Sequence, residues 1–199
     1  MVSDGNGTKG EVLLERDEAL YQRMLSGDRQ ALAALAERYY APLLAFLIRI
    51  TGQAQTAEDL VQESFIRMLK YHGPAPLAFR PWAYRIAHNL ARDYFRSAGI
   101  RREVATEINE KLEEDLLEEP QDAERLAIQA EYRSQVAALL QRLPTHQREV
   151  LVLRFYHDLP LEEIADITSA PIGTVKSRLF HGLRRARQLL ELDEVKQNE

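Results

Sequence analysis

One helical face of residues 81–96 combines three arginines with an asparagine, and aromatic residues lie beside it. Guanidinium groups bind phosphates, an asparagine amide can bond the edge of a base, and aromatic rings stack on unpaired bases. The pattern therefore indicates binding of single-stranded nucleic acid, while a solvated basic face with aromatic residues in the core is the alternative. Trp82 suits a core position better than a base-stacking position. The candidate residues are Arg80, Trp82, Arg85, Asn89, Arg92 and Arg96.

Residues 161–188 have the proportions of a helix–turn–helix, which places its second helix in the major groove of DNA. Ala165 is small enough for two helices to approach closely, and Pro171 and Gly173 separate the first helix from the second. DNA binding is therefore predicted for this segment, and a plain helical hairpin is the alternative. The candidate DNA-binding residues are Gly173, Thr174, Lys176, Ser177, Arg178, Phe180, His181 and Arg184.

The second helix of this motif has an apolar stripe opposite its polar side, as an amphipathic helix requires. Phe180 is not needed by that stripe and stands among polar neighbours. Contact with a thymine methyl group or with a partner surface would explain Phe180, and packing on a neighbouring helix is the alternative. The expected core stripe comprises Val175, Leu179, Leu183, Ala186 and Leu190.

A third cluster places acidic and amide side chains on a helix expected from about residue 56 to residue 71. Carboxylates so close together could hold Mg²⁺ or perform acid–base chemistry. However, the side chains of adjacent carboxylates diverge, and no histidine lies at a compatible helical spacing. A metal site is therefore disfavoured, and a protein-docking surface and a solvated face both remain open. The residues concerned are Glu58, Asp59, Gln62, Glu63 and Arg67.

Charge is distributed unevenly along the 199 residues, which include no cysteine and carry a net charge of −5. The missing cysteines exclude disulfides, thiol nucleophiles and cysteine-ligated metals. Net acidity argues at first against a nucleic-acid partner. Yet residues 103–124 carry ten acidic residues and one lysine, whereas residues 80–102 and 171–188 are both strongly basic. The acidity belongs to a solvated linker between two basic segments.

Helical periodicity dominates both sides of the acidic segment, and no convincing alternating strand pattern occurs. The sequence predicts an all-α fold of two small helical domains, residues 11–100 and 125–195. An acidic linker at 101–124 joins them, and a disordered tail at 1–10 precedes them. The C-terminal domain is expected to contain helices at 123–142, 145–157, 161–168 and 172–192.

Local signals set the expected helix ends in the N-terminal domain. Gly27 and Asp28 predict a helix stop followed by an N-cap, and Gly52 predicts another stop. Pro42 predicts a break or kink after Tyr40. Thr56 is the expected cap of the next helix.

No signal peptide is evident in residues 1–10, which are polar and rich in glycine. No apolar run is expected to approach the roughly 18–20 residues that span a bilayer. The longest candidate, Leu43–Ile50, is interrupted by Arg49. The expectation is a soluble, cytoplasmic protein without membrane insertion.

Two blocks of the chain resemble conserved regions of bacterial sigma factors of the sigma-70 family. Residues 28–31, 39–40, 57–65 and 82–89 resemble region 2, and residues 143–150, 163–165 and 173–179 resemble region 4. The most similar group is the extracytoplasmic-function (ECF, group IV) sigma factors, which keep only these two regions. The loop at 72–80 departs from the family pattern because it is short and rich in proline.

The resemblance implies a promoter-specificity subunit for RNA polymerase, with no catalytic residue, cofactor or metal. Residues Glu58 to Phe65 would dock on the clamp helices of the β′ subunit, and the polymerase β flap is a further expected contact. The face from Arg85 to Arg96 would hold the −10 element as a single strand, with Asn89 beside a flipped-out base. The helix from Ile172 to Gln188 would read the −35 element. A cognate anti-sigma factor is also expected.

Two other functions are compatible with parts of the sequence. A stand-alone helix–turn–helix regulator would bind its operator without polymerase, and a helical metal-dependent hydrolase would use the acidic helix. The acidic segment also predicts weak DNA binding by the free protein, because it can compete with phosphates for the basic faces.

Overall fold

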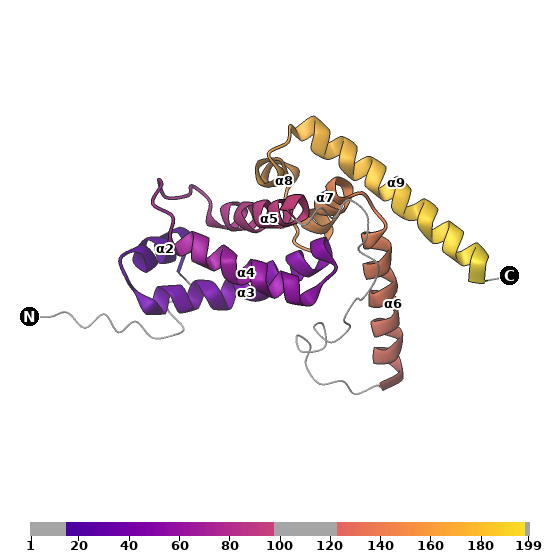
Figure 1. Ribbon diagram of the computed structural model, residues 1–199, viewed down its shortest axis with the longest axis horizontal. Helices are drawn as coiled ribbons and strands as arrows, with labels where there is room; N and C mark the ends of the chain where they lie inside the picture. The colour runs from indigo at the N-terminus through magenta and orange to yellow at the C-terminus, as the bar shows by residue number, and fades with distance from the viewer. Residues whose placement is uncertain (1–14, 98–122, 198–199) are drawn as a thin grey trace, which may run out of the picture.

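The computed structural model describes residues 15–97 and 123–197, with side chains described from 130 to 193 in the second range. Within these residues every regular element is a helix, which confirms the predicted all-α fold (Figure 1). The expected tail and most of the acidic linker lie outside the described residues. The helices are α2 (Asp17–Leu25), α3 (Arg29–Thr51), α4 (Ala54–Leu69), α5 (Phe79–Ser97), α6 (Ala123–Gln141), α7 (Thr145–Phe155), α8 (Leu161–Thr168) and α9 (Ile172–Gln197).

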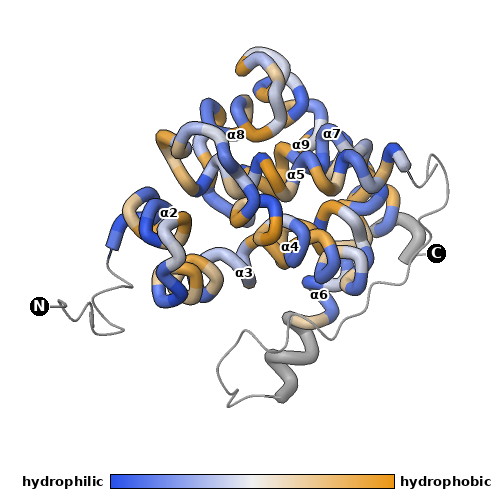
Figure 2. The backbone as a smooth tube through the Cα atoms, turned by 60° about the vertical axis from the view of Figure 1, so that its left-hand side comes forward, coloured by the Kyte–Doolittle hydropathy of each residue, from blue (hydrophilic) through white to orange (hydrophobic). Residues whose placement is uncertain are grey.

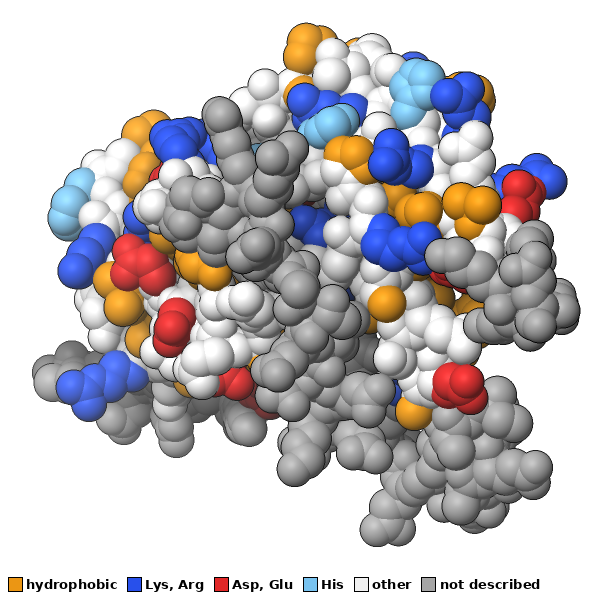
Figure 3. All heavy atoms as spheres, turned by 45° about the vertical axis from the view of Figure 1, so that its right-hand side comes forward, with side chains coloured by type: hydrophobic (Ala, Val, Ile, Leu, Met, Phe, Trp, Pro, Cys, Tyr) orange, Lys and Arg blue, Asp and Glu red, His pale blue; other side chains and the backbone are white. Residues whose placement is uncertain are grey.

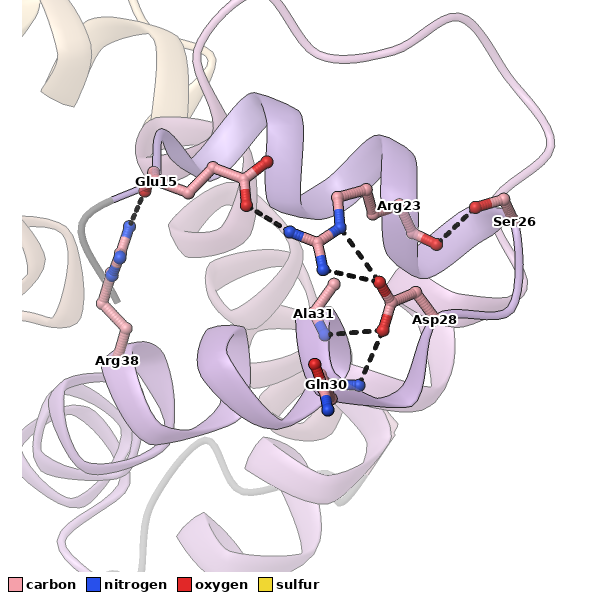
Figure 4. Close-up of polar contacts among 7 residues, drawn as sticks. All are labelled: Glu15, Arg23, Ser26, Asp28, Gln30, Ala31 and Arg38. Atoms are coloured by element: carbon pink, nitrogen blue, oxygen red, sulfur yellow. Dashed lines mark hydrogen bonds and ion pairs between the residues drawn. The ribbon is translucent and has the colours of Figure 1, made fainter. Parts of the chain in front are cut away.

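Helices α2–α5 form an N-terminal bundle around α3, whose start is fixed by Asp28. The Asp28 carboxylate accepts hydrogen bonds from the backbone N–H groups of Gln30 (2.8 Å) and Ala31 (3.3 Å), as an N-cap does. Its other oxygen accepts two hydrogen bonds from the Arg23 guanidinium, at 2.9 and 2.7 Å (Figure 4). The Arg23 hydrogen bond holds the pKa of the Asp28 carboxyl below its ordinary value. The predicted stop and cap are therefore confirmed.

Two helix boundaries differ from the expected ones. α3 continues through Pro42 without the expected break, and it ends at Thr51 as predicted, where Gly52 adopts a φ of +74°. Proline removes one backbone hydrogen bond, but α3 packs against α2, α4 and α5, which support the uninterrupted helix. α4 begins at Ala54, before the expected cap Thr56. The Thr56 hydroxyl instead donates to the side-chain oxygen of Gln53 at 2.9 Å.

Within the described residues, α3 is long and apolar enough, by length and composition, to cross a membrane. The expectation that no segment would qualify was wrong, because the leucine, alanine and isoleucine residues that precede Arg49 in α3 keep the mean hydropathy high despite Glu37 and Arg38. Leu43, Phe46, Leu47 and Ile50 are fully buried, so the apolar composition of α3 serves the protein core.

Helices α6–α9 form a C-terminal unit in which α8 and α9 make the expected helix–turn–helix. Ile164 and Val175 are fully buried between these helices, and Ser169 ends α8 with a left-handed backbone. Gly182 lets α9 approach α7 closely, since a β-carbon there would lie 3.0 Å from the Leu151 side chain. Short hydrophobic and hydrophilic stretches alternate along the helices (Figure 2), as amphipathic packing requires.

The expected apolar stripe of α9 is only partly buried. Val175 is buried and Leu179 is partly buried, but Leu183 and Leu190 are 46% and 48% exposed. The expectation was wrong for these two leucines because the side of α9 that packs on the rest of the protein runs through Gly182, Ala186 and Leu189 instead.

The N-terminal bundle and the C-terminal unit pack directly against each other. α5 packs on α8, and α3 packs on α7 and α6, so that one continuous hydrophobic core spans both parts. Figure 1 shows α5 between the rest of its bundle and the α7–α8 pair. This contact determines the surroundings of the predicted DNA-binding helix α5.

Candidate nucleic-acid interface

The polar side of α9 is an open basic surface. Gly173, Lys176, Ser177, His181 and Arg184 are exposed, while Thr174 and Arg178 are partly buried. Among the described residues, no acidic side chain forms an ion pair with these cations. In Figure 3 basic side chains and histidines gather over the upper part of the molecule, while most acidic side chains in view lie lower. This face can therefore attract phosphates.

Phe180 lies on the surface of α9 rather than against a neighbouring helix. Its side chain is 63% exposed, and its ring contacts the neighbouring His181 edge-on at 5.3 Å. Packing on another helix, the alternative left open by the sequence, therefore does not account for Phe180. Its exposed ring remains able to contact a thymine methyl group.

The predicted nucleic-acid face of α5 is exposed at its two ends, with Arg80 at the first end, and is partly buried in the middle. Arg92 and Arg96 are exposed, and Arg96 pairs with Asp93 at 3.7 Å. Arg85 and Asn89 are partly buried. The Arg85 Nε atom is fully buried without a hydrogen-bond partner in the described residues. Half of this face thus lies close to the contact between the two parts of the protein.

At the start of α5, Trp82 belongs to an aromatic cluster. Its ring contacts Tyr21, Tyr71 and Phe79, with centroid distances of 5.0, 5.2 and 5.6 Å. This packing accounts for Trp82 as a core residue and leaves only part of its surface accessible. Arg80 nearby donates a hydrogen bond to the backbone oxygen of His157, a residue of the C-terminal unit.

The acidic and amide residues of α4 lie on its outward side. Asp59, Gln62 and Arg67 are exposed, and Glu58 and Glu63 are partly exposed. Arg67 donates to Glu63 at 3.1 Å. Two exposed apolar side chains, Ile66 and Leu69, continue the same surface. In the part of the chain that the structure describes, no three histidine or carboxylate side chains come together as a metal site would require.

The contact between the two parts contains buried and partly buried polar residues that the sequence did not place together. They come from α3, α5, α7 and the turn after α7, and no local spacing relates them. In the sequence, His157 and His88 are two of five histidines that share no spacing pattern. The residues are Arg49, Tyr84, His88, Arg148, Glu149 and His157.

Arg148 connects α7 to both α6 and, indirectly, α3. It is 5% exposed and donates to the side-chain oxygens of Gln141 and Thr145, and Gln141 in turn donates to the backbone oxygen of Arg49 at 2.9 Å. Burial lowers the pKa of Arg148 to about 10, and the charge of Glu149 opposes this shift. Its Nε atom, however, is buried without a hydrogen-bond partner in the described residues, so the cation is only partly satisfied at this contact.

Comparison with known proteins assigns both helical units. The family model "Sigma-70 region 2" matches residues 35–100, and "Sigma-70, region 4" matches residues 133–185. The RNA polymerase sigma-H factor of Pseudomonas aeruginosa is 34% identical over 183 residues, which cover 89% of this chain and 93% of that protein. The chain belongs to the sigma-70 family of RNA polymerase sigma factors. The resemblance seen in the sequence is thereby confirmed.

Further relatives place this sigma factor among the ECF group. The ECF RNA polymerase sigma-E factor of Escherichia coli K12 is 32% identical over 184 residues, covering 88% of this chain and 92% of that protein. The predicted function, promoter-specific initiation of transcription, is the function of this family. The solved structure of CnrH in complex with the cytosolic domain of CnrY shares the fold. Its TM-score is 0.65 and its identity 23%, over 90% of this chain and 99% of that one.

Proposed function

We propose that this sigma factor divides promoter recognition between two helices and docks on polymerase through a third. α9 would read the −35 element as duplex DNA, α5 would hold the −10 element as a single strand, and α4 would bind the β′ clamp helices. The corresponding domains are residues 11–100 and 125–195, joined by the linker at 101–124. One observation carries the proposal: the basic face of α9, the second helix of the helix–turn–helix, is exposed and forms no ion pair with a described acidic side chain.

The division of labour follows from the chemistry of each helix. The N-terminal turns of α9 present Thr174, Lys176 and Ser177, which suit the base edges and phosphates of a major groove. Arg184 lies further along and supplies a phosphate contact that does not depend on sequence. On α5, Arg92 and Arg96 would bind the backbone of the separated strand, and the Asn89 amide would contact a base.

The outward side of α4 suits a protein partner better than DNA. Its carboxylates would repel phosphates, whereas Ile66 and Leu69 add apolar surface beside them. Such a mixture of charged and apolar groups is typical of a docking surface, and the β′ clamp helices are the proposed partner. The β flap is the proposed partner of the C-terminal unit.

As a specificity subunit, the protein would make and break no covalent bond, and it would work in the cytoplasm. An anti-sigma factor is proposed as a further partner. CnrH, which shares the fold, was itself solved with a second protein, the cytosolic domain of CnrY.

Run-off transcription with purified core polymerase tests the proposal. Addition of the protein should stimulate initiation from a subset of promoters, and Asp59→Lys should abolish the stimulation because a lysine inverts the charge of the docking surface. Arg16→Glu, also a charge reversal but on an exposed residue before α2, is the matched control. Tight binding to a palindromic operator without polymerase would instead support the stand-alone regulator, and no stimulation on any template would refute the proposal.

A further inference from the structure

The turn between α7 and α8, residues 156–160, inserts a histidine into the N-terminal bundle. The His157 ring lies between Phe46 of α3 and Tyr84 of α5, with centroid distances of 5.8 and 5.1 Å. Its Nδ1 atom is 2.8 Å from the Tyr84 hydroxyl, and the residue is only 7% exposed. The side chain of His157 is thus buried by helices other than those adjacent to it in sequence.

Hydrogen bonds to backbone carbonyl groups hold the turn in this shape. The N–H of Leu159 donates to the Leu153 carbonyl at 3.2 Å, and the Arg154 guanidinium donates to the Leu159 carbonyl at 3.1 Å. Asp158 adopts a φ of +49°, in the left-handed region. Leu159 is therefore buried within the C-terminal unit, while His157 is directed towards the N-terminal bundle.

Two arginines of the N-terminal bundle engage the same turn. Arg80 of α5 donates to the carbonyl oxygen of His157. The Arg49 guanidinium of α3 lies 4.2 Å from the centre of the Tyr156 ring, in cation–π geometry. The turn therefore meets two cations and the Tyr84 hydroxyl, but no carboxylate of the bundle forms an ion pair with His157 among the described residues.

This environment can accommodate a neutral imidazole and not an imidazolium ion. The Nε2 atom of His157 is buried without a hydrogen-bond partner, so a proton there would leave a charged donor unsatisfied. Burial, together with the charges of Arg49 and Arg80, lowers the pKa of His157 to about 3. Burial also raises the pKa of Tyr84 to about 12, so its hydroxyl stays protonated.

We propose that the turn at residues 156–160 is a proton-sensitive clasp, which holds the C-terminal unit against the N-terminal bundle while His157 is neutral and releases it when His157 takes up a proton. The proton would come from water, and no covalent bond changes. In the released form the protonated His157 side chain is exposed to water, which hydrates its charge.

Release of the clasp would favour promoter binding, a consequence that rests on the proposed function. Arg80 is engaged by the turn, and Arg85 has a buried Nε atom on α5, the helix that packs against α8. Both belong to the proposed −10 face. Release of the clasp would therefore free the N-terminal half of that face for DNA.

A second histidine lies at the same contact. The Nε2 atom of His88 lies 3.4 Å from the Glu149 carboxylate, and both residues are buried. The effect of His157 must therefore be separated from that of His88 by mutation.

The sign and size of the expected effect follow from proton linkage. Because the pKa of His157 is lower in the closed form than in the open form, its contribution to closure is complete above the ordinary histidine pKa of about 6.5 and is lost as the pH falls. Between about pH 7.5 and about pH 5.5, the opening equilibrium constant should rise about tenfold.

Energy transfer between two dyes on the full chain measures this equilibrium. Since the chain has no cysteine, Gln30→Cys and Gln188→Cys give two defined labelling sites, one exposed position in each part. Urea is set so that the closed form is half populated at the higher pH, and far-UV circular dichroism of the same samples reports helix content. Neither DNA nor polymerase is present, so failure of the clasp and failure of the sigma function are distinguishable.

The opening equilibrium constant calculated from the energy transfer should be about tenfold larger at the lower pH, while the helical signal persists. His157→Gln, whose amide can still bond Tyr84 but cannot take up a proton, should remove this dependence, and His88→Gln should retain it. The proposal is overturned if His157→Gln keeps the pH dependence of the parent, if the parent shows none, or if separation and loss of helix coincide at every urea concentration.

Discussion

Replacement of Arg184 by alanine should weaken promoter binding equally across sequences. Arg184 is exposed on α9 and forms no ion pair with a described acidic side chain. Arg187, three residues further along, is also exposed but donates to Glu191 at 2.9 Å. Arg184 and Arg187 offer a matched comparison on one helix, because Arg184 has no described acidic partner to compensate its charge and Arg187 has one.

The magnitude follows from counterion release. Each phosphate contact contributes about 0.9 to the slope of log K against log salt, so loss of one contact should reduce the slope by about 0.9. At about 0.1 M salt the same relation gives an affinity loss of about eightfold. Arg187→Ala should change the slope less, because Glu191 already neutralises much of that charge.

Fluorescence anisotropy of labelled −35 duplexes, titrated with polymerase holoenzyme at several salt concentrations, measures both quantities. Two duplexes that differ in the −35 sequence should lose the same factor on Arg184→Ala, since a phosphate contact carries no base preference. An unchanged salt slope in Arg184→Ala, or an equal change in Arg187→Ala, would refute the assigned contact.

Three further substitutions test other parts of the protein. Asn89→Ala should relax base preference in the −10 element, and transcription from templates substituted at each −10 position should reveal this; unchanged preference at every position would contradict the role. Phe46→Ala should lower the free energy of unfolding by about 3–5 kcal/mol because its ring is fully buried, as urea denaturation can measure. Asp28→Ala should lower the melting temperature more than Asp28→Asn, which keeps the cap and loses only the charge opposite Arg23. The difference between the parent and Asp28→Asn, which is the charge-dependent part, should be present above the ordinary carboxyl pKa of 3.8 and be lost on further acidification. Equal melting temperatures of Asp28→Ala and Asp28→Asn would contradict the cap, and a parent no more stable than Asp28→Asn at neutral pH would contradict the charge contribution.

The helix ends that the sequence predicted correctly depend on local chemistry. Asp28 accepts hydrogen bonds from residues two and three positions away, and Gly52 adopts its backbone angle whatever packs nearby. Two other expectations failed at positions where distant contacts decide. Pro42 stays helical because α3 has neighbours along its length, and Leu183 is exposed because the side of α9 that packs on α7 runs through Gly182.

The proposed site shows the same division. The polar faces of α9 and α4 follow directly from helical spacing, because both helices are exposed on the side away from their own packing. The partial burial of Arg85 and Asn89 could not be predicted, since α8 lies more than seventy residues further along the chain. Helical spacing defines which residues share a face but not what covers that face.

The sequence by itself determined the helices, the segregated charge, the helix–turn–helix and the family, because each depends on residue order within a short window. Only the tertiary structure decided that the two units pack together and that His157 lies against Tyr84. The physical reason is that the pKa of a histidine depends on its surroundings, which the sequence around it does not reveal. In the folded protein, burial beside Phe46, Arg49 and Arg80 favours the neutral form of His157 in the closed arrangement.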